Sequence, residues 1–568
     1  MKTKRVGWGH LSSRTWAPLL GLWAVSVATF GAFWVKWGST GWSVGSYWWD
    51  DLALSGAVAA MNQGLVPTVD FWAPFVLPLY VKQVAQELVG PVRGYLLECL
   101  MQAGLVLILF TALVWGHRQR RGVYWMGAVA VLVALLPFNL TSVAEARLGT
   151  VSFSGSYNRL GNGLLTLLFL LPVVRRKSMP SIWLSCFFAL AMLLKITVLQ
   201  AALALVGLLV WVQPGRGWLK CLLMAATGAA LLLLPLSWYF DHWQGYFAAL
   251  KGLSEVRAQV LADRAEFLNY YVYSDHRFEL FVYLFIALIF ALRGAVLRVD
   301  WLRPIVWYLA AVAVGVLFTL TNFGDNGMVP VMSAAYALFA MSDEQFKESL
   351  PELQALPMVR ALRSCAIAAT LLVGLAYAML SWRSMDGLIQ ASGRPQHALQ
   401  LFSDGGAEPY QIDEEAWSGR MYIESRWASL NLRNPKVYAT YAEKFSAALS
   451  YLQENYPARS TSVYALDFPS YVFSYFGGYR VPAGSRPWLL YGHELTLDHV
   501  PPASELLADV DILMKSNCSL SGGNRAFLGA IYRVPIERDW EKVAALPCWD
   551  VYRSKVRPMH GKGQGRLP

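Results

Sequence analysis

Long apolar runs separated by short polar segments occupy most of the chain before residue 383. Because a helix needs about 20 apolar residues to cross a bilayer, most of these runs suit a single crossing. The run at 181–212 is too long for one crossing and carries Lys195 at its middle, so we expect two helices that meet near this lysine. The other runs lie at about 15–37, 94–116, 122–141, 160–174, 219–239, 278–292, 304–321, 328–341 and 364–382. The pattern therefore predicts about 11 transmembrane helices.

The loop 38–92 holds two helical segments of a different kind. The first, 51–63, follows an acidic pair and is closed by Gly64. The second, 78–89, is amphipathic, which predicts a helix that lies in the plane of the membrane interface. Its apolar stripe consists of Tyr80, Val84 and Leu88, and its polar side chains are Lys82, Gln83, Gln86 and Glu87. A similar amphipathic segment covers 253–266.

Residues 384–568 are polar and alternate short apolar strands with helices. The segment 436–455 is an amphipathic helix by its spacing. The predicted strands are 461–467, 487–492, 510–515 and 529–534. This alternation is typical of an α/β layer domain. The predicted fold class is thus a polytopic α-helical membrane protein with a transmembrane module at 1–383 and a C-terminal extracytoplasmic α/β domain at 384–568.

Composition and charge fit this class and give it an orientation. Hydrophobic residues make up 56% of the 568 residues and charged residues only 15%, which excludes an ordinary soluble enzyme. Much of the net charge of +11 lies in short loops such as 117–121 and 175–177, which the positive-inside rule assigns to the cytoplasm. The N-terminus is then cytoplasmic and the C-terminal domain lies on the opposite side. Because no basic module stands apart from the membrane part, the charge indicates contact with membrane lipid and no nucleic acid partner.

The six cysteines divide between the two modules. Those in or beside apolar runs, expected to be packed in the core, are Cys99, Cys186, Cys221 and Cys365. Cys518 and Cys548 lie in the polar C-terminal part. They form a disulfide if this part is outside the cytoplasm, and two unpaired buried thiols are the equally weighted alternative.

The first loop carries a motif of acids, prolines and glycine. In order it contains Asp50-Asp51, an alanine-rich helix that ends at Gly64, Pro67-x-x-Asp70-Phe71, and Pro78-Leu79-Tyr80. This order resembles the first extracytoplasmic loop of GT-C glycosyltransferases, polytopic enzymes that take sugars from polyprenyl phosphates and that include protein O-mannosyltransferases and aminoarabinose transferases. Weaker similarities are Tyr157-Asn158-Arg159, Leu194-Lys195 and the turn before Met328-Val329-Pro330. The resemblance indicates a class and leaves the substrate open.

The resemblance implies that Asp50, supported by Asp51, acts as base on the acceptor or holds a metal or the acceptor. The chemistry agrees, because adjacent carboxylates raise each other's proton affinity and glycosyl transfer needs a group that takes a hydroxyl proton. Helix N-capping is the alternative for this pair. Asp70 and Asp325 are candidates for binding substrate or a divalent cation, Mg²⁺ or Mn²⁺. Their alternative role is that of ordinary turn residues.

A phosphate-linked donor needs fixed positive charge. The candidates are Arg147, Arg159, Lys195, His276 and Arg277. Lys195 is the most informative, since an ammonium at the centre of a bilayer costs about 2.5–3.5 kcal/mol on insertion scales and such charges usually have a role. Its alternatives are snorkelling to the interface, or pairing with Glu98 or Glu145.

Together these features predict a glycosyltransferase of a bacterial inner membrane. It would transfer a sugar from a polyprenyl-phosphate-linked donor to a glycan, lipid or protein acceptor on the extracytoplasmic side. The amphipathic segments 78–89 and 253–266 would border a lateral gate for the lipid. The alternatives are a transporter of lipids or solutes, and a non-catalytic component of envelope glycan assembly.

Overall fold

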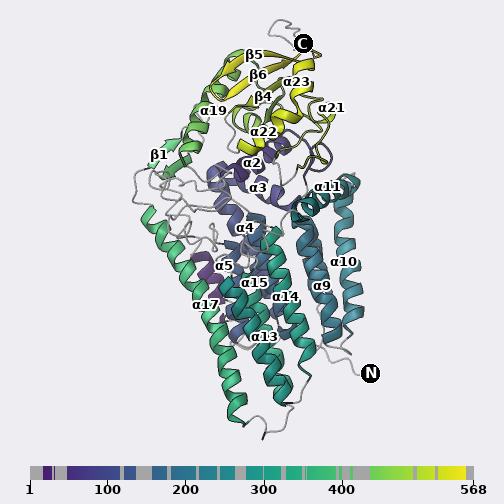
Figure 1. The fold of residues 1–568 in the computed structure, drawn as a ribbon, viewed down its shortest axis with the longest axis vertical. Helices are drawn as coiled ribbons and strands as arrows, with labels where there is room; N and C mark the ends of the chain where they lie inside the picture. Colours follow the sequence, from purple (N-terminus) through teal and green to yellow (C-terminus); the bar gives the residue numbers. More distant parts are fainter. Residues whose placement is uncertain are drawn as a thin grey trace.

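The computed structural model describes the chain in segments. These are residues 17–18, 20–28, 31, 48–73, 75–115, 121–135, 156–174, 181–212, 217–239, 243–262, 277–297, 300–321, 328–347, 352, 355–391, 396–399, 410–413, 435–489, 495–517 and 522–557. Helices form one long bundle, and the C-terminal domain sits on one end of it (Figure 1).

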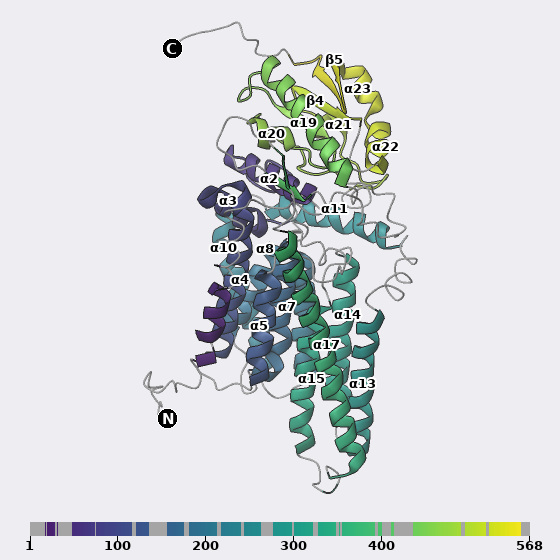
Figure 2. The same ribbon diagram turned by 90° about the vertical axis from the view of Figure 1, so that its left-hand side faces the viewer.

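The helices of the bundle come from two stretches of the chain that pack against each other. One group contains α2 (Trp48–Asn62), α3 (Leu77–Val89), α4 (Pro91–Val114), α5 (Arg121–Leu135), α7 (Ser156–Val174), α8 (Ser181–Leu194), α9 (Ile196–Val212) and α10 (Trp218–Tyr239). The other contains α13 (Arg277–Leu297), α14 (Leu302–Thr321), α15 (Val329–Lys347) and α17 (Pro357–Ala391). Between bundle and C-terminal domain lies α11 (Trp243–Ala262), which Figure 2 shows running across the top of the bundle.

Three of the described helices are long and apolar enough to cross a membrane. They contain the stretches Gly94–Val114, Tyr157–Val174 and Arg277–Leu297. Further apolar helices in the described part are shorter. The membrane class is therefore supported by length and composition, while the count of 11 crossings stays a prediction.

Helix α7 is the centre of the bundle. It packs against α4, α5 and α15, and nearly all of its apolar stretch is buried. Small residues allow the close approach, since a Cβ on Gly163 would lie 3.0 Å from the Ala130 carbonyl oxygen in α5. The buried helix fixes the position of its own first turn, which carries Tyr157, Asn158 and Arg159.

The predicted break in the run 181–212 is confirmed. Helix α8 ends at Leu194, α9 begins at Ile196, and Lys195 belongs to neither. The last helix of the bundle is longer than the predicted 364–382 and continues to Ala391, beyond the expected domain boundary. In the predicted first helix, residues 17–18, 20–28 and 31 are described and are helical.

The predicted amphipathic helix at 78–89 is confirmed as α3, with one correction. Lys82, expected on the polar surface, is only 2% exposed and packs with Leu79 and Ala85 against α4. Val84 and Leu88 of the predicted apolar stripe are instead exposed, at 41% and 68%. The face turned away from the protein thus presents two apolar side chains beside the exposed Glu87, a mixed surface that suits an interfacial helix.

The C-terminal domain contains a four-stranded sheet in the order β3-β4-β6-β5. Its strands are β3 (Val463–Leu466), β4 (Ile512–Ser516), β5 (Trp540–Leu546) and β6 (Trp549–Ser554). Strands β3 and β4 are parallel, with Val463 opposite Ile512, and the other two pairs are antiparallel. The helices are α19 (Pro435–Asn455), α20 (Val472–Gly477), α21 (Ala503–Leu506), α22 (Gly522–Ile531) and α23 (Arg533–Asp539). A separate hairpin pairs β1 (Gln396–Leu399) with β2 (Tyr410–Asp413).

Two of the strands expected in this domain are confirmed and one is wrong. Strands β3 and β4 and helix α19 match the predictions. The predicted strand 529–534 is helical, because Leu528, Tyr532 and Ile536 form a buried stripe at helical spacing. Around the expected strand 487–492, the described residues form only an isolated bridge between Pro469 and Trp488.

Cys548 is disulfide-bonded. Cys99, Cys186, Cys221 and Cys365 are free thiols. Cys518, the remaining cysteine, lies outside the described residues. The disulfide that the sequence left open is therefore present at Cys548.

Candidate functional site

The C-terminal domain docks on α2 and on the loop that follows it through backbone contacts. Gln63 Nε2 donates to the Tyr479 carbonyl oxygen at 2.8 Å, and the Val481 N–H donates to Gln63 Oε1 at 2.9 Å. Further along, the Gly484 N–H donates to the Asp70 carbonyl oxygen at 2.7 Å. A single glutamine therefore satisfies one carbonyl and one N–H of the facing domain, which fixes the register between the two parts.

Side chains on both sides of these contacts pack closely. Helix α2 lies so near α20 that a Cβ on Gly56 would stand 2.8 Å from the Tyr471 Cβ. On α11, Glu255 lies 3.2 Å from the imidazole of His499 in the C-terminal domain. The first loop, α11 and the C-terminal domain thus form one continuous assembly at this end of the bundle (Figure 2).

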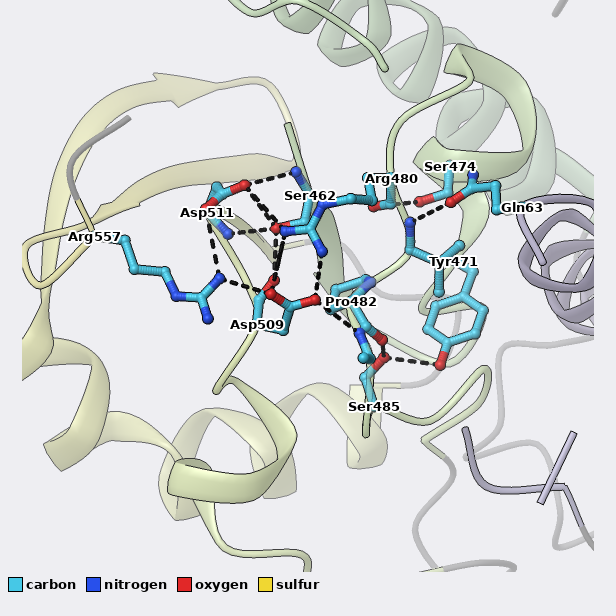
Figure 3. A network of polar contacts seen from close by, with 12 residues as sticks. Gln63, Ser462, Tyr471, Ser474, Arg480, Pro482, Ser485, Asp509, Asp511 and Arg557 are labelled. Atoms are coloured by element: carbon cyan, nitrogen blue, oxygen red, sulfur yellow. Dashed lines mark hydrogen bonds and ion pairs between the residues drawn. The ribbon is translucent and has the colours of Figure 1, made fainter. Parts of the chain in front are cut away.

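A network of acids and arginines holds the docking loop 479–485 to the sheet. Arg480 pairs with Asp509 at 2.5 Å and with Asp511 at 3.6 Å, and Arg557 pairs with Asp509 at 2.7 Å (Figure 3). Burial alone would raise the pKa of Asp509. Hydrogen bonds from Arg480, from the Ala483 N–H and from Arg557 outweigh this effect and hold that pKa below its usual value. No local sequence pattern indicates this network, which holds the docking loop in place.

The break at Lys195 is held by two hydrogen bonds from outside the helix. The Tyr246 hydroxyl of α11 donates to the Met192 carbonyl oxygen at 2.5 Å. The Val76 N–H of the first loop donates to the Leu193 carbonyl oxygen at 3.2 Å. The last carbonyls of a helix lack intrahelical partners, and here the first loop and α11 supply them.

The ammonium of Lys195 is fixed against the first turn of α7. Its Nζ donates a hydrogen bond to Asn158 Oδ1 at 2.9 Å and lies 5.2 Å from the centroid of the Tyr157 ring. Arg159 of the same turn, 2% exposed, donates to the Tyr95 hydroxyl of α4 at 2.5 Å. Two of the predicted phosphate-binding cations are therefore brought to one helix terminus.

An aromatic ladder runs from this turn into the C-terminal domain. Phe75 of the first loop stacks on Tyr157 at 4.8 Å between ring centroids and on Trp488 at 5.3 Å. Trp488 also meets Trp72 edge-on at 5.7 Å, and the Arg486 guanidinium lies 5.2 Å from the Trp72 ring. We refer to Tyr157, Phe75 and Trp488 below as the aromatic ladder.

Glu98, a proposed partner of Lys195, pairs with a different lysine. Its carboxylate lies 3.8 Å from Lys82 Nζ and accepts a hydrogen bond from Gln102 at 3.1 Å. Lys82 and Glu98 are both almost fully buried, between α3 and α4. This pair ties the interfacial helix to the bundle.

Asp70 has the geometry of a turn residue. Its Oδ2 accepts a hydrogen bond from the Val66 N–H at 2.7 Å and so closes the turn around Pro67. Among the described residues, no group of three or more His, Cys, Asp or Glu side chains is placed to hold a metal ion. The metal role of Asp70 remains a prediction.

The structure describes the other predicted site residues only in part, and it does not bring the described ones to Lys195. Asp50 and Asp51 lie at the start of α2, and their side chains are outside what the structure describes. Arg147, His276 and Asp325 also fall outside the described residues. Arg277 begins α13 and is exposed, and no described contact links it to Lys195. The catalytic acids and these cations remain predictions.

Comparison with known proteins finds similarity among solved structures. No family model matches the chain, and no curated protein matches it. Among solved structures, it is similar to the crystal structure of ArnT from Cupriavidus metallidurans bound to undecaprenyl phosphate, with 12% sequence identity and a TM-score of 0.38. The match covers 95% of this chain and 98% of that chain. At this identity and TM-score, no residue role transfers from it to this chain.

Proposed function

We propose that this protein is a membrane glycosyltransferase that takes a sugar from a polyprenyl-phosphate-linked donor. The observation that carries the proposal is the position of Lys195, whose ammonium meets the first turn of α7 through Asn158. Arg159 belongs to the same turn. The N-terminus of a helix carries a partial positive charge, which adds to the charge of a nearby cation in attracting an anion. A phosphate is an anion suited to this place, since helix N-termini bind it through N–H groups.

Helix α3 offers exposed apolar side chains along which the lipid part of the donor could reach Lys195. Helix α3 turns Val84 and Leu88 outward, while its other face packs on α4. Phe75 and Val76, at the start of α3, contact Tyr157 and the helix break at Lys195. A prenyl chain lying along the exposed face of α3 would bring its phosphate toward Lys195. This arrangement supports a lateral gate bordered by α3.

The transfer step needs a base and a stabilised leaving group. The acceptor hydroxyl oxygen would attack the sugar's anomeric carbon while the bond from that carbon to the phosphate oxygen breaks, leaving its electron pair on the phosphate. Asp50, with Asp51 beside it, would take the hydroxyl proton. Lys195 and the first-turn N–H groups of α7 would stabilise the charge that develops on the departing phosphate.

Two chemical features support a periplasmic position for the C-terminal domain. A disulfide at Cys548 suits an oxidising compartment, which for a bacterial inner membrane is the periplasm. The basic loops 117–121 and 175–177 suit the cytoplasm. The acceptor, whether glycan, lipid or protein, would meet the donor on the side of the C-terminal domain.

The test is an envelope glycan assay with purified protein or with membranes that contain matched amounts of each variant. Asp50→Asn is expected to lower transfer by about 10²–10⁴-fold, the usual loss when a general base is removed. Asp300→Asn, a change at an exposed acid before α14, is the matched control and should leave transfer unchanged. Full transfer by both Asp50→Asn and Asp51→Asn would rule out the enzymatic proposal.

A further inference from the structure

The aromatic ladder connects three separate parts of the chain. Tyr157 belongs to α7, Phe75 to the first loop and Trp488 to the C-terminal domain. The planes of Phe75 and Trp488 are inclined by 7°, and those of Phe75 and Tyr157 by 19°. Phe75 is therefore stacked against both other rings, so a change at Trp488 reaches Tyr157 through it.

The Trp488 end of the ladder is fixed within its own domain. Its side chain is 4% exposed, and its backbone forms a bridge with Pro469. The next residue, Leu489, donates its N–H to the Phe468 carbonyl oxygen and accepts a hydrogen bond from the buried Asn524 side chain at 2.9 Å. The C-terminal domain thus presents Trp488 as a rigid support and not as a loose loop side chain.

The other end of the ladder controls the place of the Lys195 ammonium. Tyr157 lies 5.2 Å from Lys195 Nζ, and Asn158, which accepts its hydrogen bond, is the next residue. The residue after Phe75, Val76, hydrogen-bonds the Leu193 carbonyl oxygen beside the helix break. A lysine side chain loses considerable conformational freedom when its ammonium is held in one position. Contacts that keep Tyr157 and Asn158 in place therefore lower the entropic cost of presenting this charge to a ligand.

We propose that the C-terminal domain positions Lys195 for its ligand through Trp488. Trp488 is a positioning residue, since it acts on the ammonium through Phe75 and Tyr157. The inference rests on the proposed function in one respect, namely that Lys195 binds the phosphate of a polyprenyl phosphate. It adds that the phosphate site reaches full affinity only when the C-terminal domain is docked.

The experiment measures the affinity of the full-length purified protein for undecaprenyl phosphate. Lys195→Ala should weaken binding about tenfold or more, as expected for loss of a charged contact. Trp488→Ala should weaken it about threefold to tenfold, the equivalent of one aromatic pair, and Trp488→Phe, which keeps a ring against Phe75, should recover most of the loss. In the Lys195→Ala background, Trp488→Ala should cause no further loss, since the two residues act as one unit.

Two further variants separate positioning from general stability. Phe75→Leu removes the middle ring without changing the C-terminal domain and should reproduce the Trp488→Ala effect. Ile536→Ala removes a buried side chain of α23, outside both the ladder and the docking contacts. It should lower the midpoint of thermal unfolding while leaving affinity within about twofold of the parent.

The outcomes distinguish this inference from the function on which it rests. An equal loss from Trp488→Ala with and without Lys195 would overturn the positioning role while leaving the phosphate site intact. Unchanged affinity in Lys195→Ala would remove the phosphate site itself, and the positioning role with it. Wild-type affinity in both Trp488→Ala and Phe75→Leu would overturn the positioning role alone.

Discussion

Lys195 Nζ donates a hydrogen bond to Asn158 Oδ1 at 2.9 Å, which joins a helix break to the first turn of the most buried helix in the bundle. The neutral amide orients the ammonium without cancelling its charge. This choice of partner matters for binding, because a carboxylate at the same place would pair with the lysine and compete with any phosphate.

Asn158→Asp is therefore expected to raise the KM for the polyprenyl-phosphate donor about tenfold or more, because a carboxylate would neutralise Lys195. Asn158→Ala should have a smaller effect on KM, since the charge remains while its orientation is lost. Asn162→Ala, one turn further along α7, is the control and should change stability without changing KM. Equal KM values for Asn158→Asp and the parent protein would contradict a phosphate contact at Lys195.

The buried pair of Lys82 and Glu98 gives a second prediction, about stability. Removing one partner leaves an uncompensated charge between α3 and α4, which typically costs about 3–5 kcal/mol. Lys82→Met and Glu98→Leu should each lower the thermal midpoint strongly, and the double variant should recover much of the loss. The measurement is thermal unfolding in detergent, analysed as a double-mutant cycle. Additive losses would show that the two side chains do not depend on each other.

Docking of the C-terminal domain depends on the close approach of Gly56 to Tyr471. Because an added Cβ would stand 2.8 Å from the Tyr471 Cβ, Gly56→Ala forces α2 and α20 apart. We expect faster proteolysis at the junction between bundle and domain. Gly104→Ala in α4 is the matched control, since nothing lies within 4 Å of its added Cβ. It should be neutral or slightly stabilising through helix propensity. Equal proteolysis of the two variants would contradict the tight contact.

The acid–arginine network predicts a pH dependence for the C-terminal domain. The pKa of Asp509 is lower in the folded protein than its usual 3.8, because hydrogen bonds from Arg480, Ala483 and Arg557 outweigh the opposing effect of burial. A depressed pKa contributes stability above the unfolded value, and this contribution is lost as pH falls through the folded value. Unfolding midpoints should thus drop as pH falls below about 4. Asp509→Asn should reduce this dependence, and an unchanged slope would exclude the network as its source.

The sequence predicted features that depend on local patterns. The break at Lys195 followed from the length of one apolar run, and α3 followed from helical spacing. The burial of Lys82 could not be read from the same spacing, since it depends on Glu98 in the next helix. Strands β5 and β6 were not predicted, because exposed charges such as Glu541 and Lys542 interrupt their apolar pattern.

In the candidate site, too, the sequence predicted individual residues but not the contacts between distant segments. Lys195 and Arg159 were both predicted as phosphate-binding cations, and in the structure both lie at the first turn of α7. Trp488 was expected only as part of a strand, and nothing near it in the sequence indicates its contact with Phe75. Contacts between rings that lie far apart in the chain come from the docking of whole domains and leave no local signature.

The break at Lys195 occurs within Leu-Leu-Lys-Ile, a sequence with neither of the residues that commonly interrupt helices, proline and glycine. Its neighbours impose it, through the Tyr246 hydroxyl and the Val76 N–H. Without these donors, α8 and α9 would be free to continue as one helix, and Lys195 would lose its fixed place against α7. The direction of this charged group is therefore determined by two segments that lie more than 45 residues away from it in the sequence.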